Sequence, residues 1–276
     1  MLTFGVDVSH WEGFIDWQTA SRWVPFVYYK ATDGTKFVDN TFTHNQQSCN
    51  SLGMPHAPYH YYQAEQDPIA QANFFISTVG RLYKRYILDL EDPPGTKKIA
   101  AELLAFLKRC EQLTGIKPAV YTSAGYWNEF VLPRPTWSHN YELLVAHYTL
   151  AHTPTLPVGW KSFVVWQFSE HFYFPGCSAA ADGDWFNGDL RQAREWFGNY
   201  RQVDPPTVSY TRLRSYFDGL HVRQQPDKRS RELDHLNKGD QVTLEELGGK
   251  DVWVRHAKGW TCVEKDGYRY MEVIKE

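Results

Sequence analysis

Short apolar runs alternate with helical patterns over the first 200 residues or so of the chain. The runs that read as strands are FGVDVS at 4–9, PFVYYKA at 25–31, YILDLE at 86–91, AVYTS at 119–123, LLVAHY at 143–148 and FVVWQFS at 163–169. Between them, Asp67-Pro68 indicates a helix start. A second helix is expected from about Lys97 to Leu113, with Gly115 as its stop. This alternation predicts parallel strands joined by helices, either in an irregular, TIM-like β/α barrel with few helices or in an open doubly wound sheet.

The last 70 residues or so follow a different pattern. From Leu220 onward, short strand-like runs are divided by Gly and Asp turns, which is typical of a small all-β barrel. Pro205 and Pro206 favour extended backbone just before this part. We therefore expect a large domain at 1–203, a linker at 204–212 and a small domain at 213–276.

Composition narrows the class of protein. The 276 residues are 42% hydrophobic and 22% charged, which is typical of a soluble globular protein. A net charge of -3 provides no general positive field, so we expect no nucleic acid partner. The aromatic fraction is 16%, and flat amphipathic rings suit contacts with sugars. Carbohydrate is the first candidate ligand.

Cysteine use and hydropathy exclude other classes. Cys49, Cys110, Cys177 and Cys262 form no CxxC pair, so we expect free thiols rather than a zinc site or a disulfide framework. No apolar stretch of about 18 residues occurs, and the N-terminus does not resemble a signal peptide. We expect a protein made in the cytoplasm with no integral membrane association.

The strongest candidate for chemistry is the acidic end of YILDLE. Side chains alternate along a strand, so Ile87, Asp89 and Glu91 share one face and the opposite face is apolar. In a parallel barrel the apolar face packs against helices, which turns both acids toward the C-terminal mouth. Asp7 occupies the equivalent place on the first strand, and Asp182 follows the last one. Together they form a candidate ring of four acids.

Crowded carboxylates raise one another's pKa, and this leaves a protonated acid beside an ionised one, as glycosidases require. Residues two apart on a strand are separated by about 6.6 Å, between the carboxyl spacings of retaining and inverting enzymes, so stereochemistry stays open. Two alternatives remain for the same acids: a solvated acidic loop, or a Mg²⁺ or Mn²⁺ site. We expect neither a metal nor another cofactor.

Two other motifs are weaker indications of a catalytic or metal site. His56 and His60 have the i, i+4 spacing of zinc ligands on a helix, but Pro55 and Pro58 exclude a regular helix there. Ser9-His10 lacks a GxSxG elbow and is not interpreted as part of a hydrolase triad.

Several aromatic residues lie on or just after strand candidates, and most of these are expected in the core. Tyr62, Tyr121 and Trp166 are the leading candidates for sugar platforms, ahead of Tyr59, Tyr61 and Tyr148.

Taken in order, a series of blocks resembles glycoside hydrolase family 25, the lysozymes or N-acetylmuramidases common among phage endolysins. The blocks are FGVDVSHWEG, YYKATDG at 28–34, PYHYY at 58–62, DLE at 89–91, VYTS at 120–123, LLVAHY at 143–148, VWQFS at 165–169 and DGDWFNG at 182–188. The likeness extends over residues 1 to about 197. It implies an irregular barrel of about eight strands with few helices.

The resemblance also implies roles for single residues. Glu91 corresponds to the general acid/base, Asp89 to the second key carboxylate and Asp7 to the acid of the first strand. Asp182 matches the acid of the final motif, with Asp184 as the competing choice because Gly183 and Trp185 depart from the usual form of that motif. The expected substrate contacts are Tyr62, Tyr121, Trp166, Lys30 and Tyr148.

The implied reaction is hydrolysis of the β-1,4 bond from N-acetylmuramic acid to N-acetylglucosamine in bacterial peptidoglycan. The tail from about Leu213 resembles a bacterial SH3-like wall-binding domain. An enzyme of this type is expected to be a monomer that acts at the bacterial wall after release from its host. The alternative from another class is a wall-binding protein that holds glycan without cutting it.

Overall fold

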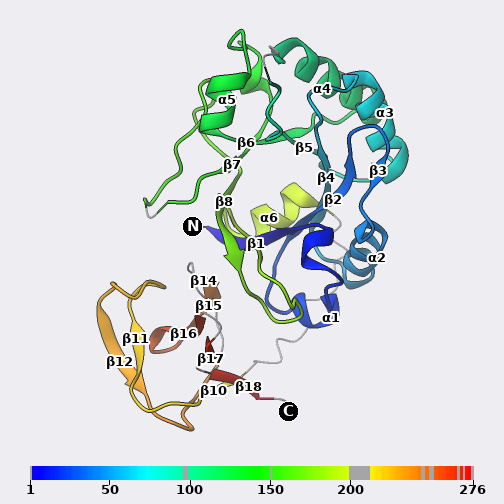
Figure 1. Ribbon diagram of the computed structural model, residues 1–276. Helices are drawn as coiled ribbons and strands as arrows, with labels where there is room; N and C mark the ends of the chain where they lie inside the picture. Colours follow the sequence, from blue (N-terminus) through cyan, green and yellow to red (C-terminus); the bar gives the residue numbers. More distant parts are fainter. Residues whose placement is uncertain are drawn as a thin grey trace. The chain divides into compact units, whose positions relative to one another are not determined.

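The computed structural model describes residues 2–95, 99–149, 151–198, 212–243, 246–248, 252–265, 268–269 and 271–274 (Figure 1). The chain divides into two compact units. The first comprises residues 1–170 and 175–201, and the second comprises residues 171–174 and 202–276. Residues 204–211 of the expected linker lie outside the described residues, and Arg212 already belongs to a strand.

The first unit is a closed barrel of eight strands. They are β1 (Thr3–Val8), β2 (Val27–Asp33), β4 (His56–Tyr61), β5 (Ile87–Asp89), β6 (Ala119–Ser123), β7 (Leu143–Ala146), β8 (Val165–Phe172) and β9 (Ala181–Phe186). The sheet order is β1-β9-β8-β7-β6-β5-β4-β2, and pairing of β1 with β2 closes it. The short strand β3 (Phe37–Val38) pairs with β2 outside this ring. The closed ring excludes the open doubly wound alternative.

Strand direction places the carboxyl ends of most strands at one mouth. The pairs from β1 through β2, β4, β5, β6 and β7 to β8 are parallel. Strand β9 runs antiparallel to β1, with Asp7 opposite Asp182. An acid from the start of β9 therefore reaches the same end of the barrel as an acid from the end of β1.

Helices are few and unevenly distributed. They are η1 (His10–Glu12), α1 (Trp17–Ala20), α2 (Phe42–Leu52), α3 (Pro68–Val79), α4 (Ala100–Thr114), α5 (Ala124–Phe130), η2 (Ser138–Asn140) and α6 (Leu190–Phe197). The Asp67 side chain accepts from the amide of Ala70 at the start of α3, and Gly115 ends α4 with a φ of 76°, both as the sequence predicts. Helices α3 and α4 cover the outer face of β4, where His60 stacks on Phe106.

The barrel interior is packed, with α6 against one end. Inward side chains from successive strands form one apolar cluster with Ala193, Trp196 and Phe197 of α6. Phe26, just before β2, stacks on Phe197 at 4.6 Å between ring centroids. A Cβ at Gly5 would come within 2.2 Å of the Phe26 ring, so the absence of a side chain on β1 admits this ring. The end near the start of β2 is thereby filled with apolar side chains.

The second unit is all-β. It contains β10 (Arg212–Ser215), β11 (Leu220–Arg223), β12 (Glu232–Leu236), β13 (Gln241–Thr243), β14 (Glu246–Gly248), β15 (Val252–His256), β16 (Gly259–Lys265), β17 (Tyr268–Arg269) and β18 (Met271–Ile274). One sheet has the order β13-β10-β18 and the other β12-β11-β16-β15-β14, with β17 on β16. Buried Leu213, Val222 and Trp253 provide apolar packing within it.

All six predicted strands occur in the first unit, with shifts of up to three residues at their ends. Strands β4 and β9 were not among the strand predictions. Pro55 and Pro58 concealed β4, because proline is unusual inside a sheet. In the described part of the chain, no helix is both long and apolar enough to cross a membrane. Cys49, Cys110, Cys177 and Cys262 are free thiols.

Candidate active site

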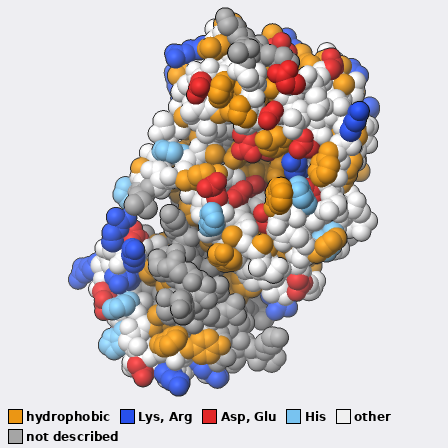
Figure 2. All heavy atoms as spheres, in the orientation of Figure 1, with side chains coloured by type: hydrophobic (Ala, Val, Ile, Leu, Met, Phe, Trp, Pro, Cys, Tyr) orange, Lys and Arg blue, Asp and Glu red, His pale blue; other side chains and the backbone are white. Residues whose placement is uncertain are grey.

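A pocket opens at the barrel mouth where the parallel strands end. It contains about 500 Å³ of empty space, part of it open to solvent. Figure 2 shows acidic side chains gathered in a hollow on this face of the barrel, with hydrophobic side chains around them. The lining residues are Asp7, Tyr28, Tyr59, Ile87, Asp89, Glu91, Tyr121, Tyr148, Gln167, Glu170 and Asp182. The four acids singled out from the sequence therefore lie in one pocket.

Strand β5 positions Asp89 and Glu91. Ile87 and Asp89 face the barrel interior, while Leu88 and Leu90 are fully buried. Glu91 follows the strand and is exposed at the pocket mouth, whereas Asp89 is only 7% exposed. The alternation read from YILDLE thus places one carboxyl deep in the pocket and the other at its entrance.

Gln167 of β8 connects the acids of β1 and β9. Its amide nitrogen donates to Asp7 Oδ2 at 2.8 Å and to Asp182 Oδ2 at 3.2 Å. Its Oε1 accepts from the hydroxyls of Tyr121 at 2.8 Å and Tyr148 at 2.6 Å. One neutral side chain thereby fixes two carboxylates and two phenols in the pocket.

Asp184 does not line the pocket. It is fully buried, and its Oδ1 accepts from the hydroxyl of Tyr28 at 2.8 Å. Its Oδ2 is buried without a hydrogen-bond partner among the described residues. Of the two competing acids in the final motif, Asp182 lines the pocket, whereas Asp184 is buried in the barrel and bonded to Tyr28.

Burial and crowding raise the pKa of every acid in this group. Burial raises the pKa of Asp7 to about 7, opposed by its hydrogen bond from Gln167. Burial and the negative charge of Asp7 raise the pKa of Asp182 to about 9. For Asp184, burial and then the charge of Asp7 raise the pKa well above its ordinary value. Near neutral pH the group therefore retains protons that isolated carboxyls would have lost.

The pKa values of Asp89 and Glu91 are raised in the same way. Burial and the repulsion of Glu91 raise the pKa of Asp89 well above its ordinary value. Partial burial of the Glu91 carboxyl group raises its pKa too. The ammonium group of Lys30 opposes both shifts, since its positive charge favours the ionised carboxylates.

Lys30 itself lies beside the pocket. Its Nζ donates to Asp33 Oδ2 at 2.9 Å and lies 4.4 Å from the ring centroid of Tyr61. The side chain is therefore held in place by an ion pair and a cation–π contact. Lys30 therefore acts on Asp89 and Glu91 through its charge, and its direct contact with substrate stays a prediction.

Two of the expected sugar platforms lie elsewhere. Tyr62 is fully buried, with its ring edge against Phe106 of α4. Trp166 is 5% exposed and donates from its indole nitrogen to the carbonyl oxygen of His147. The reason is strand alternation: Tyr59 and Gln167 point inward, and Tyr62 and Trp166 lie an odd number of residues away from them, on the outward side. Neither Tyr62 nor Trp166 presents a face to the pocket, in contrast to Tyr121 and Tyr148.

Sequence reasoning missed Tyr28, Gln167 and Glu170 as pocket residues, and it ranked Tyr59 low. A signal was available for Gln167, because it is a polar residue inside the apolar run FVVWQF and so marks the inner face of that strand. The two histidines of PHAPYH are both buried. His60 contacts Thr32 and Gln71, and His56 contacts the carbonyl of Met54.

The pocket can supply a proton and stabilise a positive charge at the same time. A protonated Glu91 at the entrance can serve as a general acid, and ionised carboxylates below it can stabilise an oxocarbenium-like transition state. In the described ranges, no group of three or more His, Cys, Asp or Glu side chains is arranged to hold a metal ion.

Comparisons with known proteins agree with this chemistry. Residues 6–177 match the family model described as glycosyl hydrolases family 25. Lysozyme M1 of Streptomyces globisporus is 30% identical over 206 residues, which cover 67% of each chain. The crystal structure of a lysozyme from Streptomyces coelicolor is 27% identical, with a TM-score of 0.65 over 72% of this chain and 98% of that one. A muramidase from Acremonium alcalophilum is also 27% identical, with a TM-score of 0.61 over 71% of this chain and 98% of the other. The chain therefore belongs to family 25 of the glycosyl hydrolases and is a glycoside hydrolase of the lysozyme type.

Proposed function

We propose that this lysozyme hydrolyses the β-1,4 bond between N-acetylmuramic acid and N-acetylglucosamine in peptidoglycan, with Glu91 as general acid and then general base. The observation that carries the proposal is the pairing of Asp89 and Glu91 in one pocket, one buried and one at the mouth. Glu91 protonates the leaving oxygen as the glycosidic bond breaks.

Asp89 is suited to orient the substrate. Its Oδ1 is buried without a hydrogen-bond partner among the described residues, so it is available for a donor from the substrate. The N–H of a 2-acetamido group is such a donor, and bonding it favours the ionised form of Asp89. When Asp89 is ionised, Glu91 is the acid of the pair that keeps its proton, as the reaction requires.

With its N–H held by Asp89, the acetamido oxygen attacks the anomeric carbon while Glu91 protonates the leaving sugar. A water molecule, deprotonated by Glu91, then opens the cyclic intermediate and restores the acetamido group. Two displacements at the same carbon retain the anomeric configuration. Asp7, whose pKa of about 7 is lower than that of Asp182, stabilises in its ionised form the positive charge that develops on the ring.

Digestion of purified peptidoglycan tests this reaction. We expect new reducing ends that mass spectrometry identifies as N-acetylmuramic acid, and proton NMR should show the β-anomer first. Glu91→Gln should release them about a thousandfold more slowly, whereas Glu129→Gln, at an exposed residue of α5, should match the unchanged protein. Cleavage of peptide bonds, glucosamine reducing ends or no reducing ends at all would contradict the proposal.

We also propose that the second unit binds the bacterial wall and tethers the enzyme to its substrate. The support is its separate all-β architecture and the exposed aromatic pair Tyr216 and Phe217, which are 40% and 52% exposed. A tether raises the local concentration of enzyme at the wall. In full-length Glu91→Gln protein, replacing both aromatics by alanine should weaken retention on cell walls about tenfold, while Leu233→Ala should not. Equal retention would remove this surface from the proposal.

A further inference from the structure

Exposed aromatic side chains lie beside the acid pocket and have no part in the mechanism above. Trp11 is 78% exposed and belongs to η1, directly after β1. Phe37 is 45% exposed and belongs to β3, which follows β2. Both positions follow the carboxyl ends of barrel strands, the edge at which the pocket opens. Large exposed rings at such an edge are typical of a binding surface.

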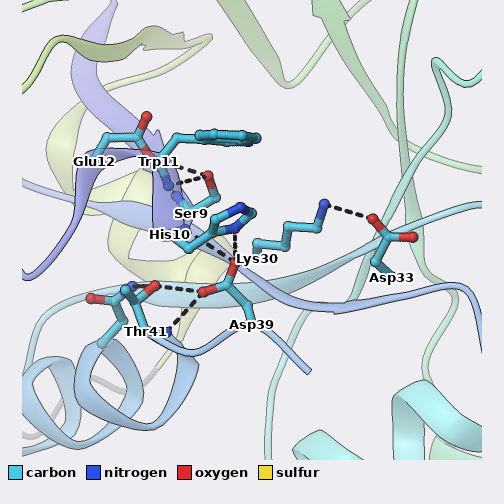
Figure 3. Close-up of polar contacts among 9 residues, drawn as sticks. Ser9, His10, Trp11, Glu12, Lys30, Asp33, Asp39 and Thr41 are labelled. Atoms are coloured by element: carbon cyan, nitrogen blue, oxygen red, sulfur yellow. Dashed lines mark hydrogen bonds and ion pairs between the residues drawn. The ribbon is translucent and has the colours of Figure 1, made fainter. Parts of the chain in front are cut away.

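A buried carboxylate holds the imidazole between these rings in place. Asp39 Oδ2 accepts from the His10 backbone nitrogen at 3.1 Å and lies 2.8 Å from His10 Nδ1 (Figure 3). Asp39 Oδ1 accepts from the nitrogen and hydroxyl of Thr41 at 2.9 and 2.7 Å. With Nδ1 donating to Asp39, the opposite ring nitrogen of His10 can bond to a ligand. The Asp39 side chain is completely buried, so this anchor is rigid.

The three rings form one surface. The His10 ring centroid lies 4.6 Å from that of Trp11 and 5.8 Å from that of Phe37. The turn that carries Trp11 is fixed by a capping box, in which Ser9 and Glu12 exchange hydrogen bonds. A ligand therefore meets a preorganised surface, and little conformational entropy is lost on binding.

This surface continues into the pocket through Lys30. The Lys30 ammonium lies 6.0 Å from the Phe37 ring centroid and 4.4 Å from that of Tyr61. Its charge acts on both Asp89 and Glu91. On the other side, Trp11 is four residues from Asp7 along the chain. Trp11 and Asp7 therefore both lie at the carboxyl end of β1, the end at which the acids gather.

We propose that Trp11, His10 and Phe37 form a glycan subsite that takes a further pyranose ring of the polysaccharide strand, beyond the sugars held at the acids. The inference rests on the proposed function and names where the strand continues. Flat rings contact the C–H face of a sugar, and a fixed imidazole nitrogen bonds a hydroxyl at its edge. Alternation of apolar faces and polar edges is the chemistry of a pyranose.

Calorimetry on full-length Glu91→Gln protein tests the subsite, with peptide-free glycan strands, peptide-bearing glycan fragments and the disaccharide repeat as probes. Added Trp11→Ala or Phe37→Ala should weaken binding of the long strands about tenfold and leave disaccharide binding unchanged. Trp11→Phe, which keeps a flat ring, should recover much of the affinity. The matched control is Leu82→Ala, a 94% exposed residue between α3 and β5, which should bind as the parent does.

Equal affinity of the Trp11→Ala and Leu82→Ala proteins for long strands would overturn the subsite. So would a loss seen only with peptide-bearing fragments, which would assign the surface to the stem peptide. These outcomes are separate from failure of the proposed function, which is measured as absent reducing ends with the unchanged enzyme. An enzyme that cuts peptidoglycan but binds long strands without help from Trp11 retains the function and loses only the subsite.

Discussion

Gln167 donates from its side-chain amide to the carboxylate of Asp7 at 2.8 Å, from the strand β8 to the strand β1 across the barrel interior. The same amide group also contacts Asp182, Tyr121 and Tyr148. A neutral donor between two carboxylates lowers their mutual repulsion and fixes their geometry.

Gln167→Glu should lower kcat/KM at least tenfold at neutral pH. The change keeps the size of the side chain, removes the amide donor and adds a charge beside Asp7 and Asp182. The pKa of both acids should rise further, so the acid limb of the pH–rate profile should move to higher pH. Gln112→Glu, on the exposed surface of α4, serves as the control. An unchanged pH profile in Gln167→Glu would contradict the assigned role.

Asp184→Asn should keep activity within about threefold of the unchanged enzyme, whereas Asp184→Leu should lose tenfold or more. An asparagine can still accept from Tyr28 through its oxygen, and it is neutral, as a carboxyl with a strongly raised pKa is near neutral pH. Leucine cannot accept this hydrogen bond. Steady-state rates on soluble glycan distinguish the two variants. Equal losses in both would show that the charge of Asp184, rather than its hydrogen bond from Tyr28, matters.

Glu91→Gln should reduce turnover by a factor on the order of a thousand and leave wall binding intact, since it removes the proton donor and little volume. Asp92→Asn, one residue further along and outside the pocket lining, should retain most activity. Reducing-end release and wall pull-down measure the two properties. Comparable turnover in both variants would remove Glu91 from the mechanism.

Stability should fall as pH rises through the range in which Asp182 titrates. Its pKa is raised from 3.8 to about 9, so the folded protein retains a proton that the unfolded chain releases. The contribution of Asp182 to the free energy of unfolding is therefore least favourable above pH 9. Asp182→Asn removes this penalty and should increase the free energy of unfolding at pH 8 by about 1 kcal/mol, after allowance for solvent screening. Thermal unfolding at pH 4 should show little difference, and a gain of equal size at both pH values would disagree with this explanation.

Tyr62→Phe should leave activity unchanged and increase the free energy of unfolding by about 0.5–1 kcal/mol. The Tyr62 hydroxyl is buried without a hydrogen-bond partner among the described residues, and removing an unsatisfied polar group is favourable. Tyr121→Phe is the matched comparison, because it removes a hydrogen bond to Gln167 in the pocket and should lower activity. Denaturant unfolding and rate assays test both. A loss of activity in Tyr62→Phe would return that residue to the list of substrate contacts.

The sequence by itself determined which local elements form and which way some of their side chains face. In YILDLE, the period of two and a wholly apolar alternate face were enough to predict that Asp89 of β5 and Glu91 just after it both face the pocket. The N-cap at Asp67 and the stop at Gly115 are likewise local chemistry, settled within a few residues. Such features can be read directly because each depends on backbone geometry that its own neighbours decide.

Only the tertiary structure decided which residues from distant strands share the pocket. Closing the sheet between β1 and β2, and reversing β9, brings Asp182 opposite Asp7 and moves Asp184 behind it. Strand β4, interrupted by prolines, is recognisable only through its pairing with β2 and β5. The inward turn of Gln167 and the outward turn of Trp166 depend on the same register. Local propensity carries no information about register across a barrel, because register is set by how all the strands pack together.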